Sequence, residues 1–128
     1  MKNIAISEDH LYRKVYAKGQ KVFCRHIAVY VLIDYRASRL AKENPLKKKL
    51  NRVGLTVTKK LGKAVVRTRT RRILRAAYQQ LEKENEVKKG FLVVIVARSA
   101  ATEAKTQDIY GDLRYAFKKL GLITHEAV

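Results

Sequence analysis

The stretch between residues 58 and 81 concentrates side chains that can bind phosphate. Its basic residues are Lys59, Lys60, Lys63, Arg67, Arg69, Arg71, Arg72 and Arg75, and it contains no aspartate or glutamate. Positive charge of this density and one-sidedness attracts polyanions. The chemistry that these residues favour is therefore phosphate binding.

The same stretch has the periodicity of an amphipathic helix that begins near Lys63. At 100° per residue, its side chains separate into two sectors. The apolar sector contains Val66, Thr70, Ile73, Leu74, Ala77, Tyr78 and Leu81, and the basic sector contains Arg67, Thr68, Arg69, Arg71, Arg72 and Arg75. One face can pack on a core while the opposite face stays cationic.

The cations crowd the N-terminal end of this helix, where the helix dipole is already positive. Each badly placed charge costs roughly 0.3–1 kcal/mol in the free protein. The arrangement becomes favourable when a polyanion docks, because backbone N–H groups then also point at phosphate. A solvated basic face is the alternative, and the lack of acidic partners favours phosphate binding over it.

A second group of side chains could bind bases. Tyr12 and Tyr16 lie one helical turn apart, beside Arg13 and Lys14. Aromatic rings on which bases stack, mixed with cations that hold phosphates, suit single-stranded nucleic acid. The alternative is that the rings cover the core. For Tyr12 the neighbouring stripe of Leu11 and Val15 already supplies that contact, whereas for Tyr16 both interpretations stay open. Tyr30 is a weaker third candidate.

Catalytic groups do not gather in the sequence. His10, His26 and His125 are scattered, and no pair of them has metal-ligand spacing. No pair of carboxylates stands out as a two-metal site, and no glycine-rich phosphate-binding fingerprint is present. A nuclease with its own active site is therefore a less favoured alternative.

The first half of the chain reads as a helix followed by a strand. Ser7 is expected to cap a helix over residues 7–18, and Gly19 to end it in the left-handed conformation. Residues 22–33 read as a strand that is apolar on both faces and thus central. A polar, exposed and mobile loop is expected at about 35–51.

The second half supplies two more strands and two helices. Residues 52–57 alternate in polarity as a second strand, expected to run antiparallel to the first. The basic helix follows, and FLVVIVA at 91–97 reads as a buried strand, so strand, helix and strand form a parallel crossover unit. A final helix is expected over 103–120, ended by Gly121.

Composition places these elements in one domain, residues 1–128 with a core at about 7–122. The 128 residues include 29 Lys and Arg against 11 Asp and Glu, a net charge of +18. Nucleic acid is the first candidate partner and an anionic membrane the second, although no apolar run approaches the ~20 residues that span a bilayer. The single Cys24 and the lack of a secretory signal suit the cytoplasm.

Over roughly residues 8–122, the sequence resembles the bacterial ribonuclease P (RNase P) protein family. Five stretches carry the resemblance, namely RVGLTVTKKLG at 52–62, AVVRTR at 64–69, RR at 71–72, YRKVYAKG at 12–19 and LVVIVAR at 92–98. The resemblance implies an α+β fold, an α/β sandwich of order α-β-β-β-α-β-α with a central mixed sheet and an unusual left-handed β-α-β crossover. It also implies three strands between 22 and 57, with a bend near Arg25–Ile27.

The function that the resemblance implies is removal of the 5′ leader from precursor tRNA. A catalytic RNA subunit would carry out the Mg²⁺-dependent endonuclease cleavage, and this chain would hold no catalytic residue and no tightly bound metal. Its RNA-facing residues would be Lys59, Lys60, Lys63, Arg67, Thr68, Arg69, Arg71, Arg72 and Arg75. Its leader-binding cleft would be lined by Tyr12, Lys14, Tyr16 and Tyr30.

Two positions depart from the family pattern. Lys63 and Thr68 stand where the family usually has asparagine, so the contact made by the second asparagine could be lost or water-bridged here. A structural ribosomal-type or RNA-chaperone protein without a catalytic partner is the alternative function. The oligomeric state stays open.

Overall fold

The protein is described here by a computed structural model over residues 4–5, 9–33 and 51–123. Its strands are β1 (Ile4–Ala5), β2 (Gln20–Phe23), β3 (Ile27–Ile33), β4 (Arg52–Thr56) and β5 (Phe91–Ala97). Its α-helices are α1 (Asp9–Lys18), α3 (Ala64–Glu84) and α4 (Thr106–Lys119), with 3-10 turns η1 (Lys59–Leu61) and η2 (Ser99–Glu103).

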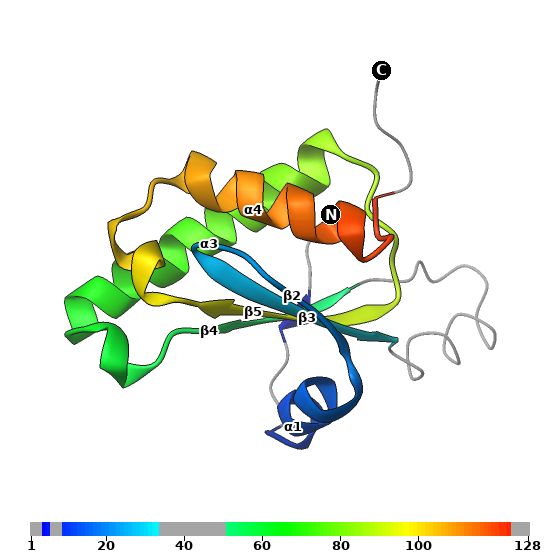
Figure 1. Ribbon diagram of the computed structural model, residues 1–128, viewed down its shortest axis with the longest axis horizontal. Helices are drawn as coiled ribbons and strands as arrows, with labels where there is room; N and C mark the ends of the chain where they lie inside the picture. The colour runs from blue at the N-terminus through cyan, green and yellow to red at the C-terminus, as the bar shows by residue number, and fades with distance from the viewer. Residues whose placement is uncertain (1–3, 6–8, 34–50, 124–128) are drawn as a thin grey trace.

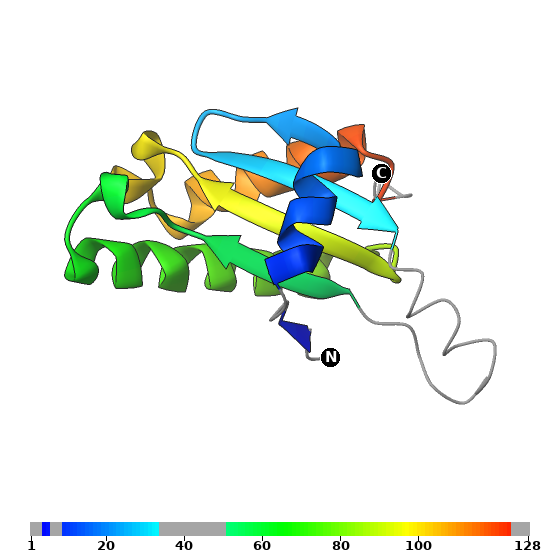
Figure 2. The ribbon, with the colours of Figure 1, turned by 90° about the horizontal axis from the view of Figure 1, so that it is seen from below.

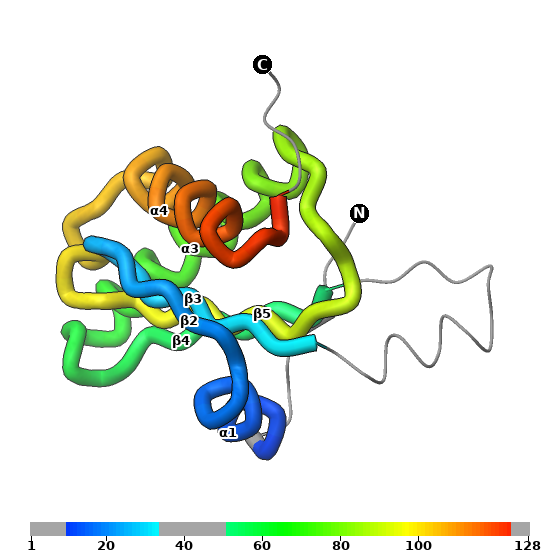
Figure 3. Tube along the Cα trace, turned by 45° about the vertical axis from the view of Figure 1, so that its right-hand side comes forward, coloured from blue at the N-terminus to red at the C-terminus, as the bar shows by residue number. Residues whose placement is uncertain are grey.

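The strands form one mixed sheet in the order β1-β4-β5-β3-β2. The apolar strand β5 lies in the middle, parallel to β4 and antiparallel to β3. Helices α3 and α4 cover one face of the sheet and α1 crosses the other (Figures 1 and 3). A sheet covered on both faces explains why β3 and β5 are apolar on both sides.

The β4–α3–β5 crossover is left-handed. Figure 2 views the sheet from the α1 side, with β4 and β5 both pointing left, β5 above β4, and α3 behind the sheet. Parallel crossovers are right-handed in about 98% of cases, so this hand is a distinctive feature of the fold. The predicted left-handed crossover and mixed sheet are thus confirmed.

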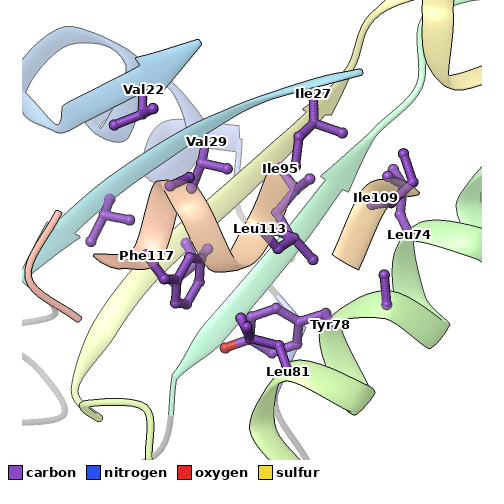
Figure 4. Packing of buried hydrophobic residues seen from close by; sticks show 14 of the residues in the cluster. Val22, Ile27, Val29, Leu74, Tyr78, Leu81, Ile95, Ile109, Leu113 and Phe117 are labelled. Carbon is purple, nitrogen blue, oxygen red and sulfur yellow. The ribbon is translucent and has the colours of Figure 1, made fainter. Parts of the chain in front are cut away.

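The main core lies between the sheet and helices α3 and α4 (Figure 4). It is made by the apolar stripes that the sequence periodicity predicts, which include Leu74, Tyr78 and Leu81 of α3, Ile109, Leu113 and Phe117 of α4, and Ile27, Val29 and Ile95 of the sheet. The Tyr78 and Phe117 rings pack edge to face, with centroids 5.9 Å apart. Thr70 is buried as predicted, because its hydroxyl donates a hydrogen bond to the Val66 carbonyl (2.8 Å).

A smaller core lies under α1. Val15 packs there on Leu92 and Val94 of β5, and all three side chains are buried. This contact anchors α1 across the middle of the sheet. It fixes where the other faces of the helix point.

The predicted boundaries hold with several corrections. The single strand expected at 22–33 is a hairpin of β2 and β3, with the bend where the family resemblance places it. Strand β4 does run opposite to β3, but β5 lies between them, so the two are not paired. The basic helix runs on to Glu84, the last helix starts at Thr106, and β1 was not predicted.

The predictions for the loop at 35–51 and for the two ends of the first helix have different outcomes. The expected loop at 35–51 and the Ser7 cap lie outside the described residues, except for Asn51. Gly19 does not adopt the left-handed conformation that was predicted, because the glycines with positive φ in the described part are Gly62, Gly90 and Gly121. A Cβ at Gly19 would lie 2.5 Å from the Val15 carbonyl oxygen, so close approach explains this glycine.

Candidate nucleic-acid interface

Four aromatic rings form a continuous row on the α1 side of the sheet. The centroids of Tyr12 and Tyr16 are 6.5 Å apart, and those of Tyr16 and Tyr30 are 4.9 Å apart in an edge-to-face arrangement. Phe23 continues the row, with its centroid 6.2 Å from that of Tyr30. The structure therefore brings together the three tyrosines that the sequence singled out and adds a fourth ring.

Two elements set the positions of these rings. Burial of Val15 under α1 turns Tyr12 and Tyr16, one helical turn apart, along one flank of the helix. Tyr30 lies on β3, on the face that α1 covers, because β-strand side chains alternate between faces. Tyr16 is 38% exposed, whereas Tyr12 and Tyr30 are half-buried, so the row is partly open to solvent.

Strand β4 supports the same row. The Tyr12 ring lies against Gly54, and the Tyr16 hydroxyl lies 3.3 Å from the Thr56 hydroxyl. Gly54 and Thr56 lie on the opposite face of the sheet from the main core, as the alternation along residues 52–57 predicts. At Gly54 this face is covered by α1, so Gly54 is buried and not exposed to solvent.

The cations near the rings differ in part from the predicted set. Lys14 is exposed, but it lies two residues from both Tyr12 and Tyr16, about 160° around the helix, so the backbone does not place it with the rings. Lys21 of β2 is paired directly opposite Tyr30 and is exposed. Residues directly opposite in an antiparallel pair share a face, so Lys21 stands beside the aromatic row.

The basic region begins where β4 ends. Thr56 closes β4, and Lys59 and Lys60 follow on η1, so the basic region adjoins the aromatic row. Helix α3 starts at Ala64 without a side-chain cap from Lys63, within the part of the chain that the structure describes. Its predicted RNA-facing residues that are exposed are Lys59, Lys60, Lys63, Thr68, Arg69, Arg72 and Arg75.

The arginines of α3 do not form a single surface. Arg69 lies on the flank next to η2, where its guanidinium donates a hydrogen bond to the Thr102 carbonyl (3.0 Å). Arg67 and Arg71 lie half-buried on the opposite flank, which they share with Tyr78. The Nε of Arg67 is buried and has no hydrogen-bond partner among the described residues.

A separate polar cluster holds the β2–β3 turn against α4. The backbone N–H of His26 donates to the Asp112 carboxylate (2.9 Å), and Nδ1 of His26 lies 2.9 Å from the same oxygen. Arg98 donates to the Cys24 carbonyl (2.7 Å). Burial, and then the nearby Asp112 carboxylate, raise the pKa of the Cys24 thiol, which favours its neutral form.

The described part of the chain offers neither a metal site nor a membrane-spanning helix. Within residues 4–5, 9–33 and 51–123, no group of three or more His, Cys, Asp or Glu side chains could hold a metal ion. In the same part of the chain, no helix is both long and apolar enough to cross a bilayer.

Comparison with known proteins decides the family. A family model described as Ribonuclease P matches residues 1–121. The chain belongs to the RNase P protein family. A relative from Clostridium acetobutylicum, the "Ribonuclease P protein component", is 34% identical over 126 residues, which are 98% of this chain and 96% of the relative. A protein of the same name from Alkaliphilus oremlandii is 35% identical over 112 residues, 88% and 86% of the two chains.

Solved structures agree on the fold. The RNase P protein of Staphylococcus aureus superposes with a TM-score of 0.74 at 23% identity, covering 96% of this chain and all of that one. The RNase P protein of Thermotoga maritima gives a TM-score of 0.67 at 18% identity, covering 93% and 97%. At such low identity these structures support the RNase P protein fold alone.

Sequence reasoning missed four residues that the structure places at this interface. Gly54 and Thr56 support Tyr12 and Tyr16, and Lys21 and Phe23 extend the row onto β2. Their signal was present in the sequence as alternation along two strands. It could not be used without the β2–β3 register, which brings Lys21 opposite Tyr30.

Proposed function

We propose that this chain is the protein subunit of a bacterial RNase P ribonucleoprotein, which releases the 5′ leader of precursor tRNA. The observation that carries the proposal is the aromatic row that adjoins the basic start of α3 through β4. Rings next to cations suit a single strand that continues into a folded RNA. The proposal places this complex in the cytoplasm.

The basic region would bind the catalytic RNA subunit. Lys59, Lys60 and Lys63 precede the first turn of α3, whose backbone N–H groups point outward, and both features favour phosphate. Arg72 and Arg75 are exposed further along the helix. Thr68 is exposed at the same surface, so its hydroxyl can donate or accept one hydrogen bond there.

The aromatic row would hold the 5′ leader. Tyr16 is the ring best placed to stack on a base, because it is exposed and lies between Tyr12 and Tyr30. Its hydroxyl meets Thr56, which fixes the ring beside the path to Lys59. A strand that leaves the rings along β4 would therefore reach the basic region next.

The cleavage chemistry would belong to the RNA. Mg²⁺ bound by the RNA subunit and the substrate would stabilise the charge that develops at the scissile phosphate. This chain would contribute binding and orientation, which lower the entropic cost of bringing leader and catalytic RNA together. No residue of the chain is assigned a catalytic role.

Reconstitution tests the proposal. We expect cleavage of a 5′-extended tRNA precursor at low Mg²⁺ by the protein and its RNA subunit together, and little by either alone. Cleavage by the protein alone would mean a protein-borne active site. Tight RNA binding with no cleavage in any mixture would instead support a structural or chaperone protein.

A further inference from the structure

Phe23 is an exposed aromatic side chain that the proposed leader contacts leave unused. Its side chain is 59% exposed, although its ring packs edge to face against the Tyr30 ring. A single exposed apolar residue is ordinary on a protein surface. Phe23 is different because its neighbours form a row that ends with it on the edge strand β2.

The register of the sheet shows that Phe23 belongs to the α1 face. Val22 points into the main core, so Phe23 points to the other face. Phe23 pairs with Ala28, Ala28 with Val96, and Val96 with Thr56, which gives one line of residues across four strands. Tyr16 stands at the Thr56 end of this line and Phe23 at the other end.

The accessible surface between the two ends of the line belongs mainly to the aromatic rings. Ala28 is buried and Val96 is half-buried, so neither offers much exposed surface between Phe23 and Tyr16. The Tyr30 ring borders the line on one side, edge-on to both Tyr16 and Phe23. A row of partly exposed rings is a surface on which flat, aromatic groups can stack.

Phe23 is also held in place. The turn that follows it is closed by the Cys24 N–H bond to the Ile27 carbonyl (2.8 Å). Arg98 bonds the Cys24 carbonyl, and Asp112 bonds the His26 N–H. A ring on a fixed turn loses little entropy when a ligand stacks on it.

We propose that the leader-binding surface continues onto β2, where Phe23 stacks on one further base of the leader and Lys21 lies beside its phosphate. This inference rests on the proposed function. Lys21 is exposed and faces Tyr30 across the hairpin, so a cation and a ring alternate along the edge strand. Stacking on an aromatic ring tolerates any base, so the added contact would extend the bound length without adding sequence preference.

The test uses the reconstituted holoenzyme and precursors whose leaders differ by single nucleotides. Single-turnover cleavage at increasing holoenzyme concentration gives a half-saturating concentration for each leader length. We expect Phe23→Ala to leave short leaders unaffected and to raise this concentration about tenfold for leaders long enough to reach β2. Phe23→Tyr, which keeps the ring, should behave as the unaltered protein.

A matched control comes from the other face of the molecule. Tyr115 of α4 is 52% exposed and lies on the far side of the sheet from α1, so Tyr115→Ala removes a similar ring without touching the row. It should leave the length dependence unchanged. Equal losses for Phe23→Ala at every leader length, or none at any length, would overturn the inference.

Failure of the extension onto β2 and failure of the proposed function would give different results. Tyr16→Ala should weaken binding even of short leaders if the proposed function is right. If Tyr16→Ala has this effect but Phe23→Ala has none, the extension onto β2 is wrong and the proposed function stands. If the unaltered holoenzyme shows no dependence on leader length, the aromatic row does not bind the leader, and the extension onto β2 is wrong as well.

Discussion

The Tyr12 ring lies against Gly54 so closely that no other residue fits at position 54 without moving it. A Cβ at Gly54 would lie 2.7 Å from both Cε1 and Cζ of Tyr12 and would overlap its hydroxyl oxygen. Contacts of this kind below 3.0 Å are essentially absent from real proteins. The glycine within the RVGLTV stretch is therefore explained by the ring of a residue 42 positions earlier.

Gly54→Ala is expected to displace the Tyr12 ring. The new methyl group must push the ring away from β4, which should cost about 1–3 kcal/mol of stability as an overpacked contact. It should also weaken leader binding if Tyr12 is part of the aromatic row. Urea unfolding and leader-length measurements on one preparation report the two effects separately.

Two further variants control this prediction. Gly111→Ala adds a methyl group in α4, where nothing lies within 4 Å of the new Cβ, so it should stabilise the protein by roughly 0.5–1 kcal/mol without altering binding. In a Tyr12→Ala background, Gly54→Ala should lose most of its effect, because the two residues act on the same space. Additive effects of the two changes would argue against the contact.

Arg72 and Arg75 are expected to set part of the salt dependence of RNA binding. Both are exposed on α3, so changing both to Gln should not disturb the core. Each lost phosphate contact lowers the log–log salt slope by roughly 0.7–1, so the pair should lower it by about 1.4–2. The slope is measured from binding isotherms of the RNA subunit at several salt concentrations.

A control pair carries the same change in charge. Lys83 and Lys88 are exposed near the C-terminal end of α3, away from η1. Changing both to Gln should leave the slope nearly unchanged if binding is localised to the basic start of the helix. Equal losses for the two pairs would show that total charge, and not the position of the arginines, governs binding.

Asp112→Ala is expected to loosen the β2–β3 turn. The change removes the acceptor of the partly buried His26 N–H, and an unsatisfied buried donor costs about 1–3 kcal/mol. Asp112→Asn keeps an acceptor oxygen and should cost less than half as much. Urea unfolding of the three proteins checks this order, and equal stability of all three would mean that the Asp112 contact does not stabilise the turn.

The sequence predicted the helices and strands better than it predicted which of them lie side by side. The alternation of apolar and basic residues in α3 was sufficient to place Leu74, Ala77 and Leu81 in the core, because helix periodicity depends only on local geometry. The row of rings depends on how the strands pair. Phe23 meets Tyr30 because β2 and β3 form a hairpin, whereas the local pattern of residues predicted one continuous strand there. Spacing along the chain does not carry that information.

Asn51 shows the same limit for a polar residue. It was predicted as part of an exposed loop, but it is fully buried, with 0% of its surface exposed. Its side-chain oxygen accepts the Phe91 N–H (3.0 Å), and its amide donates to the Lys88 carbonyl (3.1 Å) and the Tyr78 hydroxyl (3.3 Å). Asn51 can be buried because Tyr78 of α3 and the stretch from Lys88 to Phe91 supply its partners, and both lie far from it in the sequence.

Tyr78 is expected to make stability depend on alkaline pH. Burial first, and then the nearby Glu82 carboxylate, raise the pKa of Tyr78 far above its ordinary value, because both disfavour the phenolate. The folded state therefore keeps the proton that the unfolded chain loses near pH 10. The contribution is constant below about pH 10, and the free energy of unfolding should then fall by up to about 1.4 kcal/mol per pH unit.

Tyr78→Phe isolates this contribution. The variant loses the hydrogen bond from Asn51, which costs roughly 0.5–1.5 kcal/mol at neutral pH, but it has no proton to lose at this position. Its stability should therefore fall less steeply above about pH 10, and the difference from the unaltered protein should shrink there. Urea unfolding from pH 7 to 11 measures both curves; parallel curves across the whole range would show that Tyr78 ionises as readily in the folded protein as in the unfolded chain.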